Sequence, residues 1–352
     1  MEEEIVSTIN EAIQDSVEEP ILISPPTITS ASPISPTPPI SPTSPTDPTS
    51  PTSPTSPTLP TSPTDHTSPT NHSLPLVDYD TIVLSGGSVK GLLTLGSLQY
   101  ALDNYLLKNV NTYIGTSSGA MTCYLMAIGY TPIEILVELC TRQVLEKMQH
   151  PNIIQAIRGG GALSFLTIQE QLEKLTIEKI GTWLTLGELK ERFGKTLICV
   201  THNLSKDCTE YLGPDTHPNL ACIAALKMSS NLPLVFEKFL YNGSYYIDGG
   251  ISDNFAVTLG TKLGQKVLGM LVSPAPCNFP VDAELDMLEY VYKLIFIPIA
   301  QTTKHNVESV AGKCKIITLE YDHLKFFNFV VTSQTKLEMF SSGYAQAKEQ
   351  LI

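Results

Sequence analysis

The sequence predicts an α/β domain with a mostly parallel central sheet and helices on both faces. From residue 80 onward, short apolar segments rich in β-branched residues alternate with longer segments whose apolar residues recur at helical spacing. Small-residue turns follow the first two apolar segments, as is typical where a strand leads into a helix. About 270 residues remain in this part of the chain, enough for one large core.

The predicted strands are short and apolar. We expect them at 81–84, 112–114, 196–201, 245–247, 266–273 and 315–320. The segments between them have helical periodicity. We expect helices near 92–108, 118–128, 132–148, 168–180, 253–263, 282–296 and 335–350. The strongest apolar run, 285–300, contains charged residues and Pro298, so we expect a core helix there rather than a membrane span.

Composition separates residues 1–75 from the domain at 80–352. Residues 1–80 contain eleven acidic residues and no Lys, Arg or Gly, and proline recurs at every third position from Pro33 to Pro63. This period is typical of an extended polyproline II segment, so we expect a disordered, acidic, Ser/Thr-Pro-rich tail. Three roles stay open for it, namely an inert tether, a ligand for a reader of proline-rich motifs, and a substrate of a proline-directed kinase.

The charge and cysteine content narrow the function classes. The total charge of −13 lies almost entirely in the tail, because residues 81–352 contain the remaining 24 acidic residues and all 22 basic residues. A domain that is nearly neutral argues against a nucleic-acid partner. Seven scattered cysteines without a C-x-x-C pair indicate a reducing compartment and no zinc site. We therefore expect a cytoplasmic protein.

The small-residue turn Gly115-Thr116-Ser117-Ser118-Gly119 reads G-x-S-x-G and lies between a predicted strand and a predicted helix. Such an elbow exposes a serine hydroxyl, and its glycines permit a strained backbone and close approach of a substrate. Ser117 is therefore a candidate nucleophile for acyl transfer. The alternative is a plain turn in which Ser118 caps the helix.

Two further segments carry candidate groups. The turn at 85–91 contains Gly86, Gly87 and Gly91, whose backbone amides are free to face an anion, and it lacks the ending of a P-loop. A second strand delivers Asp248 into a Gly-Gly turn, where a partly desolvated carboxylate can accept the proton of a nearby serine. An Asp-Gly-Gly turn with a purely structural role is the alternative.

Taken in order, these segments resemble the patatin-like phospholipase family over about residues 81–262. The matching residues are Gly86, Gly87, Lys90 and Gly91; Gly115, Ser117 and Gly119; the segment 225–233; and Asp248, Gly249, Gly250 and Asn254. The resemblance implies that Ser117 is the nucleophile and that Asp248 is its only base. It also implies an oxyanion hole made by the amides of Gly86, Gly87 and Ser88.

Three positions depart from the family pattern. Ser88 replaces a glycine and puts a Cβ into the oxyanion turn, Lys90 replaces an arginine, and Ala256 stands where proline is common. None of these changes removes a catalytic group.

The resemblance implies a lipid acyl hydrolase of phospholipase A type that acts on phospholipids or related acyl lipids at a transient membrane surface. It also implies a protein that is peripheral to membranes and uses no metal or organic cofactor. The alternative is a catalytically weak or inactive lipid-binding or adaptor protein on the same fold, recruited through its proline-rich tail. A conventional triad with His305 or His323 is a second mechanism, although no motif surrounds either histidine. Two apolar segments, 232–240 and 326–331, either pack inside or touch lipid.

Overall fold

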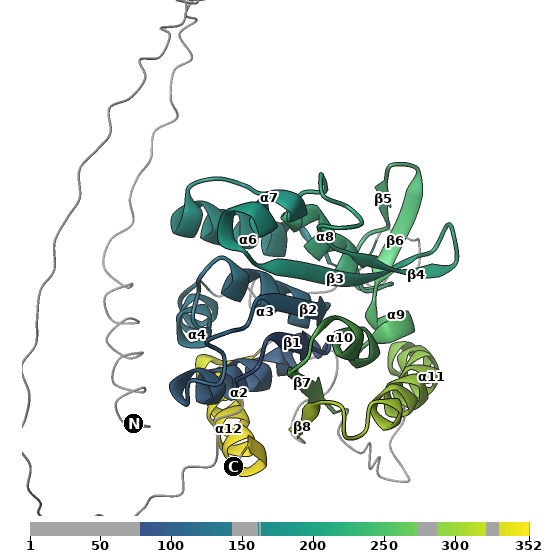
Figure 1. The fold of residues 1–352 in the computed structure, drawn as a ribbon. Coiled ribbons are helices and arrows are strands. Elements are labelled where there is room, and N and C mark those ends of the chain that lie inside the picture. The colour runs from purple at the N-terminus through teal and green to yellow at the C-terminus, as the bar shows by residue number, and fades with distance from the viewer. Residues whose placement is uncertain (1–77, 143–160, 162, 274–286, 322–330, 352) are drawn as a thin grey trace, which may run out of the picture. The chain divides into compact units, whose positions relative to one another are not determined.

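The computed structural model describes residues 78–142, 161, 163–273, 287–321 and 331–351, and Figure 1 shows their arrangement. The predicted tail at 1–75 lies outside the described residues, as does the apolar segment at 326–330.

A mixed sheet of eight strands forms the centre of the described chain, in the order β5-β6-β3-β2-β1-β7-β8, with β4 paired to β3. Four of its seven pairings are parallel and join five neighbouring strands. These are β1 (Thr81–Leu84), β2 (Thr112–Thr116), β3 (Thr196–Asn203), β7 (Val267–Val272) and β8 (Lys315–Leu319). Three antiparallel strands extend one side, namely β4 (Cys208–Leu212), β5 (Phe239–Tyr241) and β6 (Ser244–Asp248).

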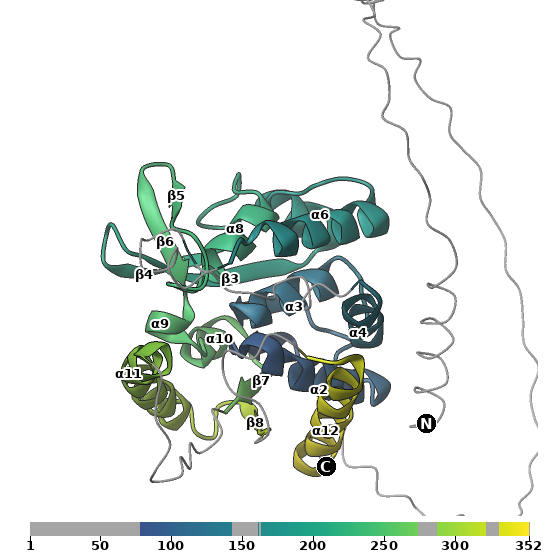
Figure 2. The same cartoon turned by 180° about the vertical axis from the view of Figure 1, so that it is seen from behind.

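Helices connect these strands and cover both faces of the sheet (Figures 1 and 2). They are α2 (Gly91–Asp103), α3 (Ser118–Ala127), α4 (Pro132–Thr141), α6 (Leu166–Ile180), α7 (Leu186–Phe193), α8 (Cys222–Ser229), α9 (Gly250–Asp253), α10 (Val257–Leu263), α11 (Met287–Ser309) and α12 (Ser333–Leu351), with a short 3₁₀ helix η1 at Ser88–Lys90.

Alternating side chains of the central strands feed two separate cores. Ile82 and Leu84 of β1 belong to the larger core, while Val83 between them belongs to the smaller core beneath α10 and the end of α11. Successive side chains of a strand point to opposite faces, so a strand that is apolar at every position must be covered on both sides. The all-buried pattern of β1 confirms the prediction of helices on both faces.

Some predicted elements differ from the structure. The helix expected at 253–263 is two helices, α9 and α10, because the chain leaves the helix at 254–256. The helix expected at 92–108 ends at Asp103, and α7, α8, β4 and β5 were not predicted. The expectation that the run 285–300 is a core helix is wrong in part, because α11 exposes Tyr290, Leu294 and Ile297.

None of the described helices is by itself long and apolar enough to cross a membrane. The pair α3 and α4, bent by 118°, meets that criterion only when both helices are counted together.

Candidate active site

Ser117 lies between the last residue of β2 and the first residue of α3, as predicted. Its backbone has φ 55° and ψ −125°, a conformation that residues with a Cβ rarely adopt. β2 is a central strand, paired on one side with β1 and on the other with β3. The strained turn therefore holds Ser117 at the carboxyl edge of the parallel sheet, where open α/β sheets bind ligands.

The two glycines of the elbow are required by close backbone contacts. A Cβ on Gly115 would lie 2.5 Å from the backbone of Ala120, and a Cβ on Gly119 would lie 2.6 Å from the carbonyl oxygen of Ser85. Real Cβ atoms essentially never come so close to backbone atoms. These glycines let α3 begin directly over the end of the sheet.

The register of the sheet brings Asp248 to the level of Ser117. Thr116 of β2 pairs with Val200 of β3, and Asp248 of β6 pairs with Thr201, the next residue of β3. β4 occupies the other edge of β3 along 199–203, so β2 and β6 lie on the same edge of β3, one after the other. Ser117 and Asp248 therefore lie where the ends of these two strands meet, and the Ser117 hydroxyl is close enough to the carboxylate to affect its pKa.

Asp248 is buried at the end of β6. Burial raises the pKa of its carboxyl group from 3.8 to about 6, and the nearby Ser117 hydroxyl and the hydrogen bond from the Gly250 N–H act in the opposite direction. The Gly250 N–H donates to Oδ1 of Asp248 over 2.7 Å. The carboxylate is thus a stronger base than an exposed aspartate and is still largely ionised at neutral pH.

The last residue of α8 and the segment that follows it fix both candidate groups. The Ser117 N–H donates to the hydroxyl of the buried Ser229 over 3.0 Å, and the Asp248 N–H donates to the carbonyl oxygen of Asn231 over 3.0 Å. The Gly249 N–H also donates to the Ser229 carbonyl oxygen, over 3.2 Å. Ser229 and Asn231 lie within the segment 225–233 that the sequence analysis noted, but their anchoring roles were not predicted.

The three amides expected to form an oxyanion hole differ in what they bind. The Gly86 N–H donates to the Asn254 carbonyl oxygen over 3.2 Å, and the Asn254 side-chain amide donates back to the Gly86 carbonyl oxygen over 3.4 Å. The Gly87 N–H donates to the Ser118 hydroxyl over 3.1 Å. The Ser88 N–H has no hydrogen-bond acceptor among the described residues.

Ser88 also has an unusual backbone. Its φ is +51°, in the left-handed region that favours glycine. This conformation explains why a glycine is common at the position, and it shows that the serine is accommodated with strain. Asn254 contacts both Gly86 and Gly250, since a Cβ on either glycine would lie within 3 Å of its Oδ1. Asn254 thus joins the glycine-rich turn to the Asp248 turn.

Lys90 and Gly91 lie at the edge of this arrangement. The Lys90 ammonium group donates to the carbonyl oxygen of Tyr321 over 2.9 Å, which ties η1 to the segment after β8. A Cβ on Gly91 would lie 3.2 Å from the Ser118 hydroxyl, so this glycine leaves space beside the elbow.

A cavity of about 180 Å³ opens beside Ser117. Leucine, isoleucine and methionine side chains of α2, α3, α4 and α6 make up much of its wall, and Ser88, Ser117 and Ser118 lie along it. Its largely apolar lining suits a hydrocarbon chain whose reacting end lies at Ser117.

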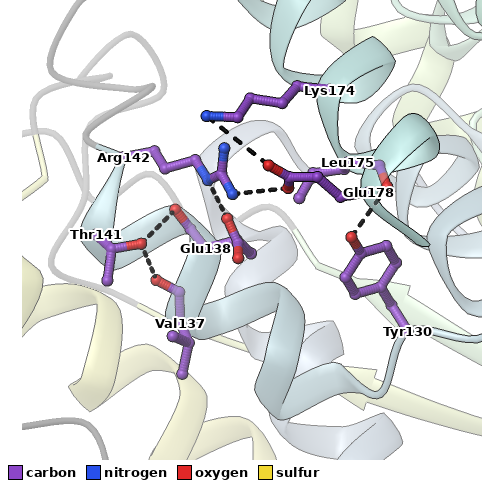
Figure 3. Close-up of polar contacts among 8 residues, drawn as sticks. All are labelled: Tyr130, Val137, Glu138, Thr141, Arg142, Lys174, Leu175 and Glu178. Carbon is purple, nitrogen blue, oxygen red and sulfur yellow. Dashed lines mark hydrogen bonds and ion pairs between the residues drawn. The ribbon is translucent and has the colours of Figure 1, made fainter. Parts of the chain in front are cut away.

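Ion pairs hold two of the cavity walls together (Figure 3). Glu138 of α4 lines the cavity, and its carboxylate pairs with Arg142 one turn later. Arg142 also pairs with Glu178 of α6 over 2.8 Å. The Tyr130 hydroxyl donates to the carbonyl oxygen of Leu175, another lining residue, over 3.0 Å. The one acidic side chain of the lining therefore has its charge compensated, and α4 is fixed to α6.

No described histidine hydrogen-bonds to Ser117 or Asp248. His305 is exposed on α11, His202 lies 3.5 Å from Asp207, and His217 contacts Thr216. His323 lies outside the described residues.

Cys123 is buried behind the elbow, and burial raises the pKa of its thiol, which disfavours the reactive thiolate. Among the described residues, no group of three or more His, Cys, Asp or Glu side chains is arranged to hold a metal ion.

Comparisons with known proteins agree with the order of these segments. Residues 82–259, half of the chain, match the family described as Patatin-like phospholipase. A probable lipid hydrolase, 463L, of Invertebrate iridescent virus 6 is 33% identical over 194 residues, which cover 53% of this chain and 65% of the viral protein, just under two thirds of its length. An uncharacterized protein of Acanthamoeba polyphaga mimivirus is 22% identical over 280 residues, covering 77% of this chain and 93% of that protein.

Among solved structures, VipD from Legionella pneumophila has a TM-score of 0.44 and 18% identity, over 78% of this chain and 67% of VipD. The family match includes the glycine-rich turn, the Ser117 elbow and the Asp248 turn in one continuous stretch. The chain belongs to the patatin-like phospholipase family.

Proposed function

We propose that this protein is a serine-dependent lipid acyl hydrolase of phospholipase A type, which cleaves ester bonds of phospholipids or related acyl lipids through a Ser117–Asp248 dyad. The observation that carries the proposal is the position of the buried Asp248 carboxylate beside the Ser117 hydroxyl, which lies at the wall of an apolar cavity. Family membership and the name of the iridescent virus relative, a probable lipid hydrolase, support the choice of substrate class.

In the acylation step, ionised Asp248 accepts the Ser117 proton while Oγ attacks the ester carbonyl carbon. The resulting oxyanion needs hydrogen-bond donors. The Ser88 N–H has no acceptor among the described residues, and the Gly87 N–H becomes available when the Ser118 hydroxyl turns away. The carbon–oxygen ester bond then breaks, and the departing alcohol takes the proton from Asp248. An acyl-Ser117 ester remains, with its hydrocarbon chain in the cavity.

In the deacylation step, Asp248 removes a proton from water, whose oxygen attacks the acyl-Ser117 carbonyl carbon. The bond from this carbon to Oγ breaks, Oγ takes the proton back from Asp248, and a free fatty acid leaves. The same carboxylate thus serves as base and acid in both steps, so no histidine is needed.

One observation favours a second candidate, a weak or silent lipid-binding protein on the same fold. The Gly87 N–H is already bonded to the Ser118 hydroxyl, and Ser88 has a Cβ in the oxyanion turn. An oxyanion hole in which this hydrogen bond must first break stabilises the transition state less than a hole with free donors. On this alternative, lipid binds in the cavity and turnover is absent.

The experiment is a hydrolysis assay of Ser117→Ala, Asp248→Asn and the double variant on a panel of phospholipids and simpler acyl esters. Two residues of one proton-transfer unit are strongly non-additive, so the double variant is expected to be little worse than either single variant. Ser341→Ala on α12 and Asp207→Asn, both exposed, are the matched controls. Losses that multiply contradict the dyad, and an equally disabling His305→Ala supports the triad instead. Binding without turnover by the parent supports the silent protein.

We also propose that residues 80–352 act as the hydrolase domain and that residues 1–75 serve recruitment, through a reader of proline-rich motifs or a proline-directed kinase. The support is compositional, since the Ser/Thr-Pro repeats begin and end before Asp80. Deletion of residues 1–75 is expected to leave the melting temperature and turnover on dispersed substrate unchanged. A large fall in melting temperature contradicts the division.

A further inference from the structure

A small apolar cluster lies beside the cavity, apart from the two main cores. It consists of Phe165, Val235 and Phe236, with the rings of Phe165 and Phe236 in edge-on contact at 5.2 Å. Phe236 also lines the cavity that contains Ser117. Phe296 of α11 packs against the same cluster, so a helix from the far end of the chain reaches the active-site region.

Three large apolar side chains are exposed around this cluster. Leu166 is 53% exposed, Leu234 is 38% exposed and Ile297 is 56% exposed. Each is the chain neighbour of a cluster residue, namely Phe165, Val235 or Phe296, so its Cα lies only about 3.8 Å from that residue's Cα. Three separate elements, the start of α6, the loop after α8 and α11, thus present apolar side chains to solvent around one cluster.

The exposed apolar face continues along α11. Leu294 is 51% exposed and Tyr290 is 49% exposed, and with Ile297 they follow the helical spacing of i, i+4 and i+7. α11 therefore has one apolar face without a covering partner among the described residues.

The exposed Leu234 is also strained. Its φ is +66°, in a region that disfavours residues with a Cβ. The neighbouring Val235 and Phe236 are buried, so the backbone strain holds Leu234 outward while its neighbours pack inward. An exposed leucine in a costly conformation is a reason to look for a function.

The topology puts the apolar half of α11 at the edge of the sheet that carries Ser117. β7 ends at the carboxyl edge of the parallel strands, and the parallel strand β8 begins at the opposite edge. The chain between them, which contains α11, must therefore return from the carboxyl edge to the opposite edge. Tyr290, Leu294 and Ile297 lie in the first half of α11. In both views α11 lies beside α9, the helix that follows the Asp248 turn (Figures 1 and 2).

We propose that Leu166, Leu234, Tyr290, Leu294 and Ile297 form the surface through which this domain docks onto a phospholipid bilayer, here called the docking rim. The inference rests on the proposed function, because it assigns the place where a lipid substrate enters. The continuity between the rim, the cluster and the apolar cavity favours lipid as the occupant. An acyl chain that leaves a bilayer at this rim stays in apolar surroundings until it reaches Ser117.

One ion pair lies beside the cluster. Lys227 lies over the ring of Phe165 at 5.6 Å and pairs with Glu237 at 3.9 Å. This pair leaves no net charge of its own to select anionic lipid. Insertion of apolar side chains, which salt does not screen, is then the main contribution to binding.

The test uses the full chain with vesicles of phosphatidylcholine. The rim variant is Leu294→Glu together with Ile297→Glu, and Leu166→Glu on α6 is a second, independent rim variant. The matched control is Leu263→Glu, because Leu263 is 54% exposed at the end of α10, close to the start of β7 at the opposite edge. Vesicle binding is measured by sedimentation on a Ser117→Ala background, so that turnover does not alter the vesicles.

Both rim variants are expected to lower the vesicle-bound fraction about tenfold or more at unchanged melting temperature, whereas the control binds like the parent. With Ser117 restored, turnover of vesicle substrate falls by a similar factor while turnover of a monomeric short-chain ester is unchanged. Equal binding by rim and control variants overturns the proposal. A parent that does not bind vesicles also overturns it, and the rim is then a protein interface. Normal vesicle binding without hydrolysis of any ester removes the proposed function but leaves the docking rim intact.

Discussion

Replacement of Asp248 by asparagine is expected to stabilise the protein at neutral pH while it abolishes turnover. Burial raises the carboxyl pKa from 3.8 to about 6, which means that the folded state disfavours the ionised carboxylate. Asparagine is similar in shape and keeps an oxygen for the Gly250 N–H, but it has no charge to bury. The variant therefore removes the desolvation penalty and keeps the hydrogen bond to the turn.

The size of the effect follows from linkage between protonation and folding. For a raised carboxyl pKa, the folded state binds the proton more tightly than the unfolded state, so stability is lost as pH rises between about 4 and 6. One pKa unit corresponds to about 1.4 kcal/mol, so a shift of about two units gives about 3 kcal/mol at pH 7.5. At about pH 4.5 most of the folded carboxyl is protonated, and the difference between the variants falls to about 1 kcal/mol.

The assay is urea unfolding of the parent and Asp248→Asn at these two pH values. Titration of every other carboxylate is common to both proteins and cancels in the comparison. A gain of about 3 kcal/mol would raise the melting temperature of a domain of this size by roughly 6–12 °C. An asparagine variant that is less stable than the parent at pH 7.5, or a difference that does not change with pH, refutes the reasoning.

Three further outcomes follow from the site. The kcat/KM for a monomeric ester is expected to fall tenfold per pH unit below about pH 6, because protonated Asp248 cannot act as base; a flat profile contradicts this role. Ser88→Gly is expected to gain about 1 kcal/mol in the free energy of unfolding, because glycine adopts the positive φ of Ser88 without strain, and turnover is expected to be kept or raised. Ser88→Ala is expected to gain nothing, and equal stability of the two variants contradicts the strain. Gly119→Ala is expected to lower the free energy of unfolding by about 3 kcal/mol or more, measured by thermal unfolding, because its Cβ would lie 2.6 Å from the Ser85 carbonyl oxygen. Gly91→Ala, whose Cβ would lie 3.2 Å from the Ser118 hydroxyl, is expected to lose less, and similar losses contradict the close-packing argument.

Much of the fold follows from local patterns that the sequence displays. Buried strands with apolar residues at every position and helices of ten or more residues produce strong signals, and the parallel centre of the sheet was predicted from them. β5 has three residues and β4 is a largely half-buried edge strand, so neither has an apolar pattern of its own. Their positions depend on pairing with β6 and β3, which is a tertiary contact.

The Ser117 elbow and the Asp248 turn were predictable because their glycines and their order along the chain are distinctive. The anchoring hydrogen bonds were not, because Ser229 reaches Ser117 from 112 residues away. The exposed face of α11 was also missed. Apolar residues at helical spacing predict a buried helix face. Only the structure distinguishes a face that packs on the core from an apolar face that is exposed at the surface.

The most direct test of the central proposal is the site of covalent modification by a fluorophosphonate, an analogue that reacts with activated serines. Peptide mapping by mass spectrometry after reaction of the full chain is expected to place a single adduct on Ser117. The Asp248→Asn variant is expected to react far more slowly, because its serine lacks a base. An adduct elsewhere, an unmodified Ser117 in the folded parent, or equal labelling of parent and variant contradicts the Ser117–Asp248 dyad.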